Sequence, residues 1–241
     1  MCRLLGIVAS EPVDFRVLLA DRPRSLAALG EEHRDGWGLA SFSEGSWQIH
    51  KGTRPASHDD RFRRRAHALR GELLVSHVRK RTVGVTRMVN SHPFVRGTWV
   101  FAHNGTIDDR AWLRAQVSPA RAAEIRGDTD SELFFAHVLT RLDANVSVPR
   151  IVAECRARAS FGSFNFLLSD GASCYVHRFG RSMYLLERGS RHSVPSRRTN
   201  AVFVASEPMT DEAWCEIDDG SLLRIDRGAV HPPRVTTLSA T

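Results

Sequence analysis

The sequence has almost no lysine. Of its 34 basic residues only Lys51 and Lys80 are lysine, and all the others are arginine. The formal charge of +7 and the pI of about 10.0 would by themselves suggest a nucleic-acid partner. However, so strong a preference for arginine is typical of codon bias in a GC-rich genome, not of a selected basic patch. Nucleic-acid binding therefore stays only a minor alternative, and the densest cluster, Arg61–Arg70, should be a solvated helix face.

Long apolar runs are also missing. No stretch approaches the roughly 20 apolar residues that a membrane-spanning helix needs, so we expect no membrane association. Glu11, Asp14 and Asp21 interrupt any signal-peptide core near the N-terminus. With 241 residues, 42% hydrophobic and 25% charged, the chain suits a globular protein of one large or two small domains. A cytoplasmic enzyme or binding protein is the default expectation.

Cysteines are few and irregularly spaced, at positions 2, 155, 174 and 215. They form neither a CxxC pair nor the dense framework of a secreted disulfide-rich domain. We expect reduced thiols, with Cys155 and Cys174 buried.

Hydrophobic patterning predicts strands at both ends of the chain and helices between them. Strands are expected at Arg3–Ser10, at both sides of a turn at Ser43–Gly45, at Glu72–Val78 and at Thr98–Gly105, and in five segments between residues 162 and 226. Helices are expected over Val13–Leu29 with a break near Pro23, over Asp59–Arg70, from Asp128–Thr129 onward, and over Val148–Ala159. Thr129 and Glu132 have the spacing of a capping box. This order favours an α+β sandwich of two sheets between helical layers.

Four polar stretches are not explained by core packing: Glu31–Ala40, Ser76–Gly84, Asn90–Gly105 and Gly127–Glu132. Each lies at the edge of a predicted strand or helix, where functional side chains are common. Each taken alone also has an ordinary explanation. Asp-Gly and Asn-Gly are common turn dipeptides, an arginine is often a surface residue, and an aspartate favours a helix N-terminus.

Together with Cys2, the motifs HRDGWGLA, HVRKRT, HPF, AHNG and TDSE resemble the glutaminase domain of class II glutamine amidotransferases, especially its small stand-alone members. The later segments SFNFLLSDG and VFVASEPMTDEAW extend the resemblance over nearly the whole chain. It implies a four-layer αββα fold of the N-terminal nucleophile hydrolase type. It also implies a single domain over residues 1–241, with a loose tail after about residue 232.

The resemblance assigns Cys2 as a nucleophile that attacks a side-chain amide. Removal of Met1 would free the Cys2 α-amine, whose ordinary pKa of about 7.7–8.0 lets it take the thiol proton near neutral pH. Taken by its position alone, the cysteine would more simply be an accident of the second codon. In the family, the Asn and Gly of the HNG motif form the oxyanion hole, here the Asn104 side chain and the Gly105 N–H.

A glutamyl substrate also needs partners for its charged head. The resemblance assigns the α-carboxylate to Arg79, because a guanidinium pairs with a carboxylate through two parallel hydrogen bonds. It assigns the α-ammonium to Asp130, and Thr82 is expected to line the same pocket. The residues expected to support the site from behind are Arg34, Asp35, Gly36 and His103.

Histidines at positions 77, 92 and 103 invite a metal-site interpretation, but the sequence has no HExxH motif or paired His–carboxylate helix spacing. We expect them to be structural or pocket-lining, and we expect no metal and no cofactor.

The expected reaction is hydrolysis of the glutamine side-chain amide through a γ-glutamyl thioester, releasing glutamate and ammonia. The chain leaves no evident room for a synthase domain, so ammonia would pass to a separate synthase subunit. Alternatively, the substrate is another γ-glutamyl amide, as in the relative that acts on an ergothioneine precursor. A non-catalytic binding module on the same fold, or another N-terminal-nucleophile amidase, also remains open.

Overall fold

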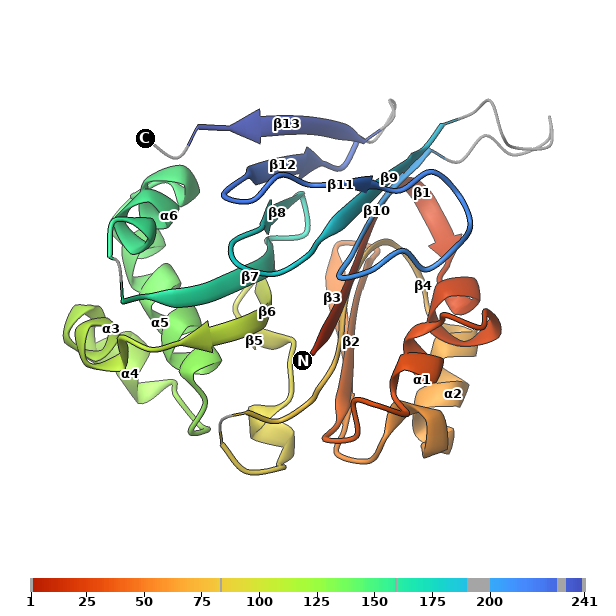
Figure 1. Cartoon of the computed structure of the whole chain (residues 1–241), viewed down its shortest axis with the longest axis horizontal. Coiled ribbons are helices and arrows are strands. Elements are labelled where there is room, and N and C mark those ends of the chain that lie inside the picture. Colours follow the sequence, from red (N-terminus) through yellow and green to blue (C-terminus); the bar gives the residue numbers. More distant parts are fainter. Residues whose placement is uncertain (1, 83, 159, 190–199, 229–232, 240–241) are drawn as a thin grey trace.

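Two antiparallel sheets pack face to face between two layers of helices in the computed structural model (Figure 1). The structure describes residues 2–82, 84–158, 160–189, 200–228 and 233–239. The first sheet has the strand order β11-β9-β10-β1-β4-β2-β3, and the second has the order β13-β12-β8-β7-β6-β5. The α+β class and the four-layer αββα arrangement expected from the sequence are confirmed.

The strands of the first sheet are β1 Arg3–Asp14, β2 Trp37–Ser43, β3 Ser46–Gly52, β4 Arg70–Val78, β9 Tyr184–Arg188, β10 Ala201–Ala205 and β11 Cys215–Glu216. Those of the second are β5 Phe94–Arg96, β6 Trp99–Ile107, β7 Gly162–Ser169, β8 Ser173–His177, β12 Leu222–Asp226 and β13 Arg234–Leu238. The outer layer on the first sheet contains η1 Val17–Asp21, α1 Leu26–Leu29, η2 Ala56–His58 and α2 Asp60–Ala68. Short η3 Met88–Asn90 precedes β5, and the other outer layer contains α3 Arg110–Gln116, α4 Pro119–Ala123, α5 Asp130–Asp143 and α6 Val148–Arg156.

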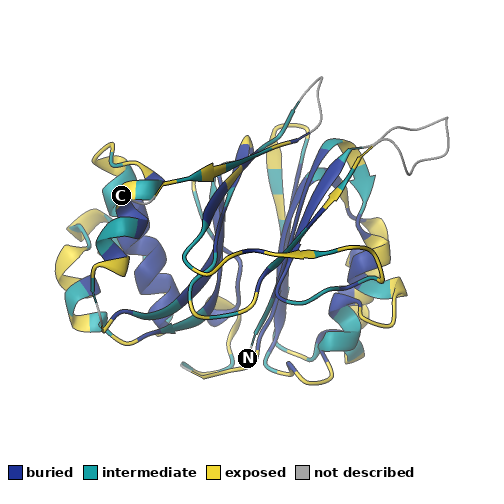
Figure 2. Cartoon of the chain, turned by 45° about the horizontal axis from the view of Figure 1, so that its top comes forward, coloured by how far each residue is buried: buried dark blue, intermediate teal, exposed yellow. Residues whose placement is uncertain are grey.

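Three apolar clusters hold the four layers together, and Figure 2 shows the buried residues concentrated along the sheets and the inner sides of the helices. β1 contributes to two of them. Leu5 and Ile7 pack toward α1 and α2, whereas Leu4 and Val8 pack between the sheets. Because both faces of this part of the strand are covered, its sequence from Leu4 to Ala9 is a continuous apolar run without polar alternation.

Helix α5 begins where the sequence predicts. The Thr129 hydroxyl caps it by accepting a hydrogen bond from the Glu132 N–H at 3.2 Å. The Glu132 carboxylate does not return to Thr129 as in a full capping box. It accepts instead from the Gly127 N–H at 2.6 Å and pairs with Arg96 at 2.7 Å.

Three expectations about the elements were wrong. β1 continues to Asp14, so the first helical turn starts only at Val17. Helices α3 and α4 were not expected. The expected loose tail is instead strand β13 over Arg234–Leu238, which pairs along the whole of β12. β13 pairs with the backbone N–H and C=O groups at the edge of β12, which would otherwise be free. The sequence of the tail alone does not indicate this pairing.

The expected solvated helix face is confirmed in α2, where Arg61, Arg64 and Arg65 are exposed while Phe62 and Ala66 are buried. Cys155 and Cys174 are buried as expected. In the part of the chain that is described, no helix has both the length and the apolar character to cross a bilayer.

Candidate active site

Cys2 lies at the start of β1, beside the end of β4. The Lys80 N–H donates to its sulfur at 3.3 Å, and the thiol lies 3.3 Å from the Lys80 carbonyl oxygen, to which it can donate. The pairing of Arg3 with Val78 sets this register between the two strands. The sulfur is therefore held in place by the backbone of the β4 end, whatever side chain position 80 carries.

Burial raises the pKa of the Cys2 thiol. The hydrogen bond from Lys80 and the positive charge of Arg79 act in the opposite direction, while the Asp130 carboxylate adds to the increase. Arg79 and Asp130 are thus both close enough to Cys2 to influence its ionisation. A thiol with a raised pKa remains protonated near neutral pH, so it needs a base before it can act as a nucleophile.

The alternation of the strands directs these residues into the layer between the sheets. Leu4 packs in the inter-sheet core and is paired with His77, so Cys2 and Arg79, each two residues away, face the same side. On the second sheet, Ala102 packs in that same core, which places Asn104 on the face toward Cys2. 

Arg79 is buried, with 3% of its surface exposed. Its guanidinium donates to the Val85 carbonyl at 3.1 Å, and its backbone forms two hydrogen bonds, with Gly36 at 2.8 Å and Asp35 at 3.0 Å. Burial lowers the pKa of Arg79, and the negative charges of Cys2 as thiolate and of Asp35 counteract this effect. A buried guanidinium beside the thiol is a suitable partner for a substrate carboxylate.

The Asp35 carboxylate braces the loop that follows Arg79. It accepts from the Arg81 N–H at 2.9 Å and from the Thr86 hydroxyl at 3.1 Å. Thr82, the third residue expected in the substrate pocket, lies exposed in this loop. Asp35 thus contacts both the backbone and a side chain of this loop.

Of the two neighbours of Asp35, Gly36 is required by the backbone, whereas the Arg34 side chain lies at the surface. Gly36 has φ +120°, and a side chain there would meet the Gly52 carbonyl oxygen at 2.6 Å, so only glycine fits. Arg34 is exposed and its Nε donates to the Glu31 carbonyl at 2.6 Å. The structure therefore directs the Arg34 side chain toward Glu31 at the surface.

Asp130 and His103 lie where β6 meets the start of α5. Asp130 is buried, and its Oδ2 accepts from the Ile107 N–H at 2.7 Å. His103 Nδ1 lies 2.8 Å from the Ser131 hydroxyl. Burial lowers the pKa of His103, while the Asp130 carboxylate raises it.

Asn104 and Gly105 occupy adjacent positions of β6. Asn104 is 5% exposed and is paired with Asn165 of β7. A Cβ at position 105 would lie 2.0 Å from the Ser163 carbonyl oxygen, so the strand pairing requires glycine there. The motif that the sequence presents as a turn dipeptide is thus part of a strand.

Sequence reasoning assigned no role to Asn90, Asp128 or Asn165. Asn90 Nδ2 donates to the Val85 carbonyl at 2.8 Å and to the Asp128 carboxylate at 2.6 Å, which ties the loop to the segment before α5. Asn165 holds the segment after β8 beside Asn104. All three are polar residues in or near the four polar stretches or within a predicted strand, but no spacing relates them to Cys2.

Of the three histidines expected to be structural or pocket-lining, two are in direct contact. The rings of His77 and His92 lie 4.3 Å apart between centroids, and both side chains are buried. Burial lowers the pKa of each well below its ordinary value. Among the described residues, no three His, Cys, Asp or Glu side chains are grouped so that they could hold a metal ion.

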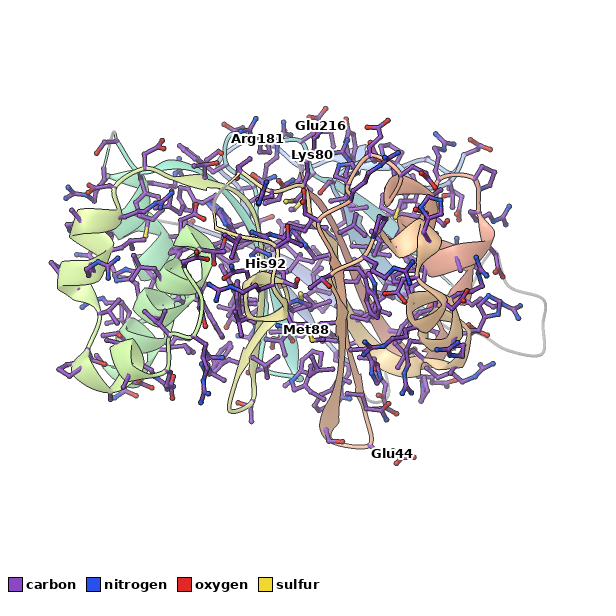
Figure 3. All side chains as sticks on the ribbon, turned by 90° about the horizontal axis from the view of Figure 1, so that it is seen from below. Glu44, Lys80, Met88, His92, Arg181 and Glu216 are labelled. Carbon is purple, nitrogen blue, oxygen red and sulfur yellow. The ribbon has the colours of Figure 1, made fainter. Side chains whose placement is uncertain are left out.

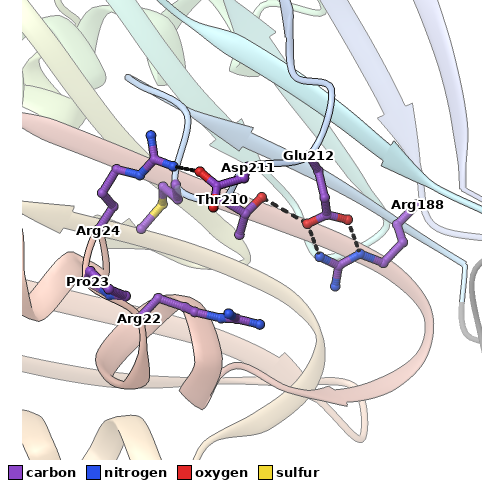
Figure 4. Close-up of a pocket in the computed structure, with 8 residues that line it drawn as sticks. Arg22, Pro23, Arg24, Arg188, Thr210, Asp211 and Glu212 are labelled. Carbon is purple, nitrogen blue, oxygen red and sulfur yellow. Dashed lines mark hydrogen bonds and ion pairs between the residues drawn. The ribbon is translucent and has the colours of Figure 1, made fainter.

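A cleft of about 820 Å³ lies away from Cys2, between η1 and the loop after β10 (Figure 4). Its charged side chains largely neutralise one another: Arg24 pairs with Asp211, and Arg188 binds Glu212 through Nε at 3.0 Å and through a second nitrogen. None of the proposed site residues lines it, so its size is no guide to the chemistry.

The model for class II glutamine amidotransferases matches residues 1–194. The chain belongs to this family. It is 30% identical to the γ-glutamyl-hercynylcysteine sulfoxide hydrolase of Mycobacterium tuberculosis, covering 95% of both chains, and 27% identical to a putative glutamine amidotransferase of Haemophilus influenzae, covering 95% of this chain and 85% of the other.

Solved structures of the family share the fold. A glutamine aminotransferase class-II domain protein from Silicibacter pomeroyi superposes over 100% of both chains with a TM-score of 0.70 at 20% identity. The phosphoribosylpyrophosphate amidotransferase of Bacillus subtilis matches all of this chain with 49% of its own, at a TM-score of 0.70 and 17% identity. The chain thus has the fold of a portion of that enzyme amounting to about half of its length.

Proposed function

We propose that this protein hydrolyses γ-glutamyl amides, with glutamine as the simplest substrate, and that Cys2 is the nucleophile once Met1 has been removed. The observation that carries the proposal is the position of the Cys2 thiol, fixed by the Lys80 backbone and under the influence of both Arg79 and Asp130. A carboxylate-binding cation and an ammonium-binding anion beside a thiol suit an amino-acid head next to a reactive sulfur.

The freed α-amine of Cys2 takes the thiol proton, and the thiolate attacks the γ-carbonyl carbon. Donors from Asn104 and the Gly105 N–H stabilise the oxyanion of the tetrahedral intermediate. The protonated amine then gives its proton to the leaving nitrogen, which leaves a γ-glutamyl thioester on Cys2. Water hydrolyses the thioester and releases glutamate.

Two sources of the leaving nitrogen are candidates. With glutamine it is ammonia, which would pass to a separate synthase subunit. The second candidate is a larger amine, favoured by the M. tuberculosis relative, whose name describes a γ-glutamyl compound of this kind and whose length matches this chain. The free thiols of Cys2 and of exposed Cys215 suit a reducing cytoplasm in either case.

The test is intact-protein mass spectrometry after brief treatment with the glutamine analogue 6-diazo-5-oxo-norleucine. We expect a chain without Met1 that gains one adduct, mapped to Cys2, and no adduct in Cys2→Ala. A processed chain that remains unlabelled would contradict the proposal, because it would lack either the nucleophile or the glutamyl pocket. Cys215→Ala, which removes an exposed thiol, serves as the control for nonspecific alkylation.

A further inference from the structure

The sheet order gives the site two distinct sides. In the first sheet β1 lies between β4 and β10, and in the second β6 lies between β5 and β7. Arg79 and its loop lie on the side of β4. A glutamyl head bound by Arg79, with its γ-carbonyl at Cys2, therefore directs the leaving amine toward the opposite side, where β10 and β7 lie.

The segment after β8 forms the wall on that opposite side. Asn165, which faces Asn104 in the β6–β7 pairing, donates from Nδ2 to the carbonyl oxygens of Arg181 at 2.9 Å and Ser182 at 3.2 Å. Its Oδ1 accepts from the Phe179 N–H at 2.8 Å. The backbone around Arg181 is thus fixed to β7, the strand next to the proposed oxyanion-hole strand β6.

The same segment is tied to the first sheet. The Ser182 hydroxyl donates to the Ser206 carbonyl at 3.0 Å, and the Ser206 hydroxyl accepts from the Leu4 N–H at 2.9 Å. The next residue, Glu207, forms an ion pair with Arg3 at 3.1 Å. The wall therefore spans both sheets and ends at the start of β1, within two residues of Cys2.

Arg181 in this wall has an unused positive charge. Its Nε is buried without a hydrogen-bond partner, and its guanidinium has no ion pair within the described residues. Arg178, three residues earlier, is by contrast paired with Glu216 at 2.7 Å. Figure 3 shows Arg181 and Lys80 at the same edge of the molecule in that view. A buried N–H without a partner costs free energy that a bound oxyanion would recover.

We infer that Arg181 recognises an acidic group on the leaving amine, so that the preferred substrates are γ-glutamyl amides of amines that carry a carboxylate, such as γ-glutamyl amino acids. This inference rests on the proposed function and specifies its substrate class. The guanidinium fork binds a carboxylate through two hydrogen bonds, a geometry that ammonia or an uncharged amine as leaving group cannot use.

The experiment compares two substrates that differ only in this charge, γ-glutamylglycine and γ-glutamylglycinamide. We expect the wild-type protein to have a kcat/KM about 10-fold or more higher for the acid, and Arg181→Ala to remove most of this preference. Arg181→Lys should retain part of it, because a point charge replaces the fork. Arg114→Ala, at an exposed position of α3, is the matched control and should keep the wild-type ratio.

The outcomes separate the two proposals. If the wild-type protein hydrolyses neither compound and Cys2 is not labelled, the proposed function fails. If it hydrolyses both at equal kcat/KM, or if Arg181→Ala retains the full preference for the acid, only the role of Arg181 is overturned. Should Arg181→Ala fail to fold, Arg181→Gln keeps the size of the side chain without its charge and must lose the same preference.

Discussion

At position 2 the sequence alone leaves two explanations, a nucleophile or an accident of the second codon. The structure adds physical content to the first, because the thiol is fixed by the Lys80 backbone and its pKa is raised by burial. An uncharged thiol of this kind gains reactivity only from a base on the same residue or next to it. The α-amine released by removal of Met1 is such a base, and retention of Met1 ties it up in a peptide bond.

Cys2→Ala should therefore abolish release of glutamate while leaving the fold intact. The side chain lies at the start of β1 and is only partly buried, so its truncation should change the free energy of unfolding by about 1 kcal/mol or less. Glutamate release and urea unfolding measure the two quantities. Turnover that survives in Cys2→Ala would remove the nucleophile assignment, and Cys215→Ala should be fully active.

Arg79→Lys tests the grip on the α-carboxylate. We expect KM to rise about 10-fold to 100-fold with a smaller change in kcat, because an ammonium replaces two parallel hydrogen bonds by one contact. Steady-state kinetics with glutamine measures both constants. Arg81→Lys, two residues later and exposed, is the control. A KM equal to that of the wild-type protein would place the carboxylate elsewhere.

Some of the residues around Cys2 could be predicted from the sequence, and others could not. Cys2, Arg79, Asn104 and Asp130 were assigned to the site because they occur in short motifs that resemble those of class II glutamine amidotransferases. Asn90 and Asn165 were not found, because each acts through contacts with segments far away in the chain, and strand pairing creates those contacts only in three dimensions. No local sequence pattern indicates that these residues contact such distant segments.

Among the elements, the loop from Arg79 to Asn90 depends on side chains from outside it. Asp35→Ala would remove the two hydrogen bonds that the carboxylate accepts from Arg81 and Thr86. We expect KM to rise several-fold and amide hydrogen exchange to quicken in residues 84–90, each bond being worth about 1 kcal/mol. Asp60→Ala, an exposed aspartate on α2, should change neither. Unaltered exchange in Asp35→Ala would show that the loop is held by other contacts.

Helix α5 makes stability depend on pH through His137. This side chain is buried against Trp112, and burial, assisted by Arg141, lowers its pKa to about 4. In the unfolded chain His137 is protonated as the pH falls through about 6.5, whereas in the folded chain it stays neutral down to about pH 4. The contribution of His137 to stability is therefore complete above pH 6.5 and decreases as the pH falls from 6.5 toward 4.

His137→Leu should reduce the slope of unfolding free energy against pH by about 1.4 kcal/mol per pH unit in the steep part of this range. Urea unfolding measured at intervals of about half a pH unit between about pH 4.5 and 7 gives the free energy of unfolding at each pH, and hence the slope. Val138→Ala, a buried neighbour that does not titrate, should lower stability equally at every pH. An unchanged slope in His137→Leu would mean that the imidazole is already protonated in the folded state.

The elements that the sequence predicted well are those with strong local signals. β1 has an unbroken apolar run over Leu4–Ala9, and α5 begins at Asp130 with Thr129 as its cap. β13 was missed, because a strand at the sheet edge draws its stability from the partner strand β12 and not from its own pattern. Helices α3 and α4 are only 7 and 5 residues long, too short for a helical period to be distinct.

At the scale of the whole molecule, the order of strands and helices already favoured two sheets between helical layers. It did not specify which strands neighbour one another. The order β10-β1-β4 brings the beginning of the chain between segments about 75 and 200 residues away. That neighbourhood positions Cys2, and it results from long-range pairing that local patterns do not encode.

The shared core between the sheets implies that the chain unfolds as one cooperative unit, as proposed for a single domain. Leu167 of β7 is fully buried there and approaches Gly6 of β1. Leu167→Ala should lower the free energy of unfolding by about 2–5 kcal/mol. Under conditions where amide exchange occurs through global unfolding, the substitution should quicken exchange equally in β4 and β7. Hydrogen exchange followed by mass spectrometry resolves peptides from both sheets. Val85→Ala, at an exposed position, should change neither. Acceleration confined to β7 would show that the two sheets open independently, because a cavity between cooperative layers must destabilise both.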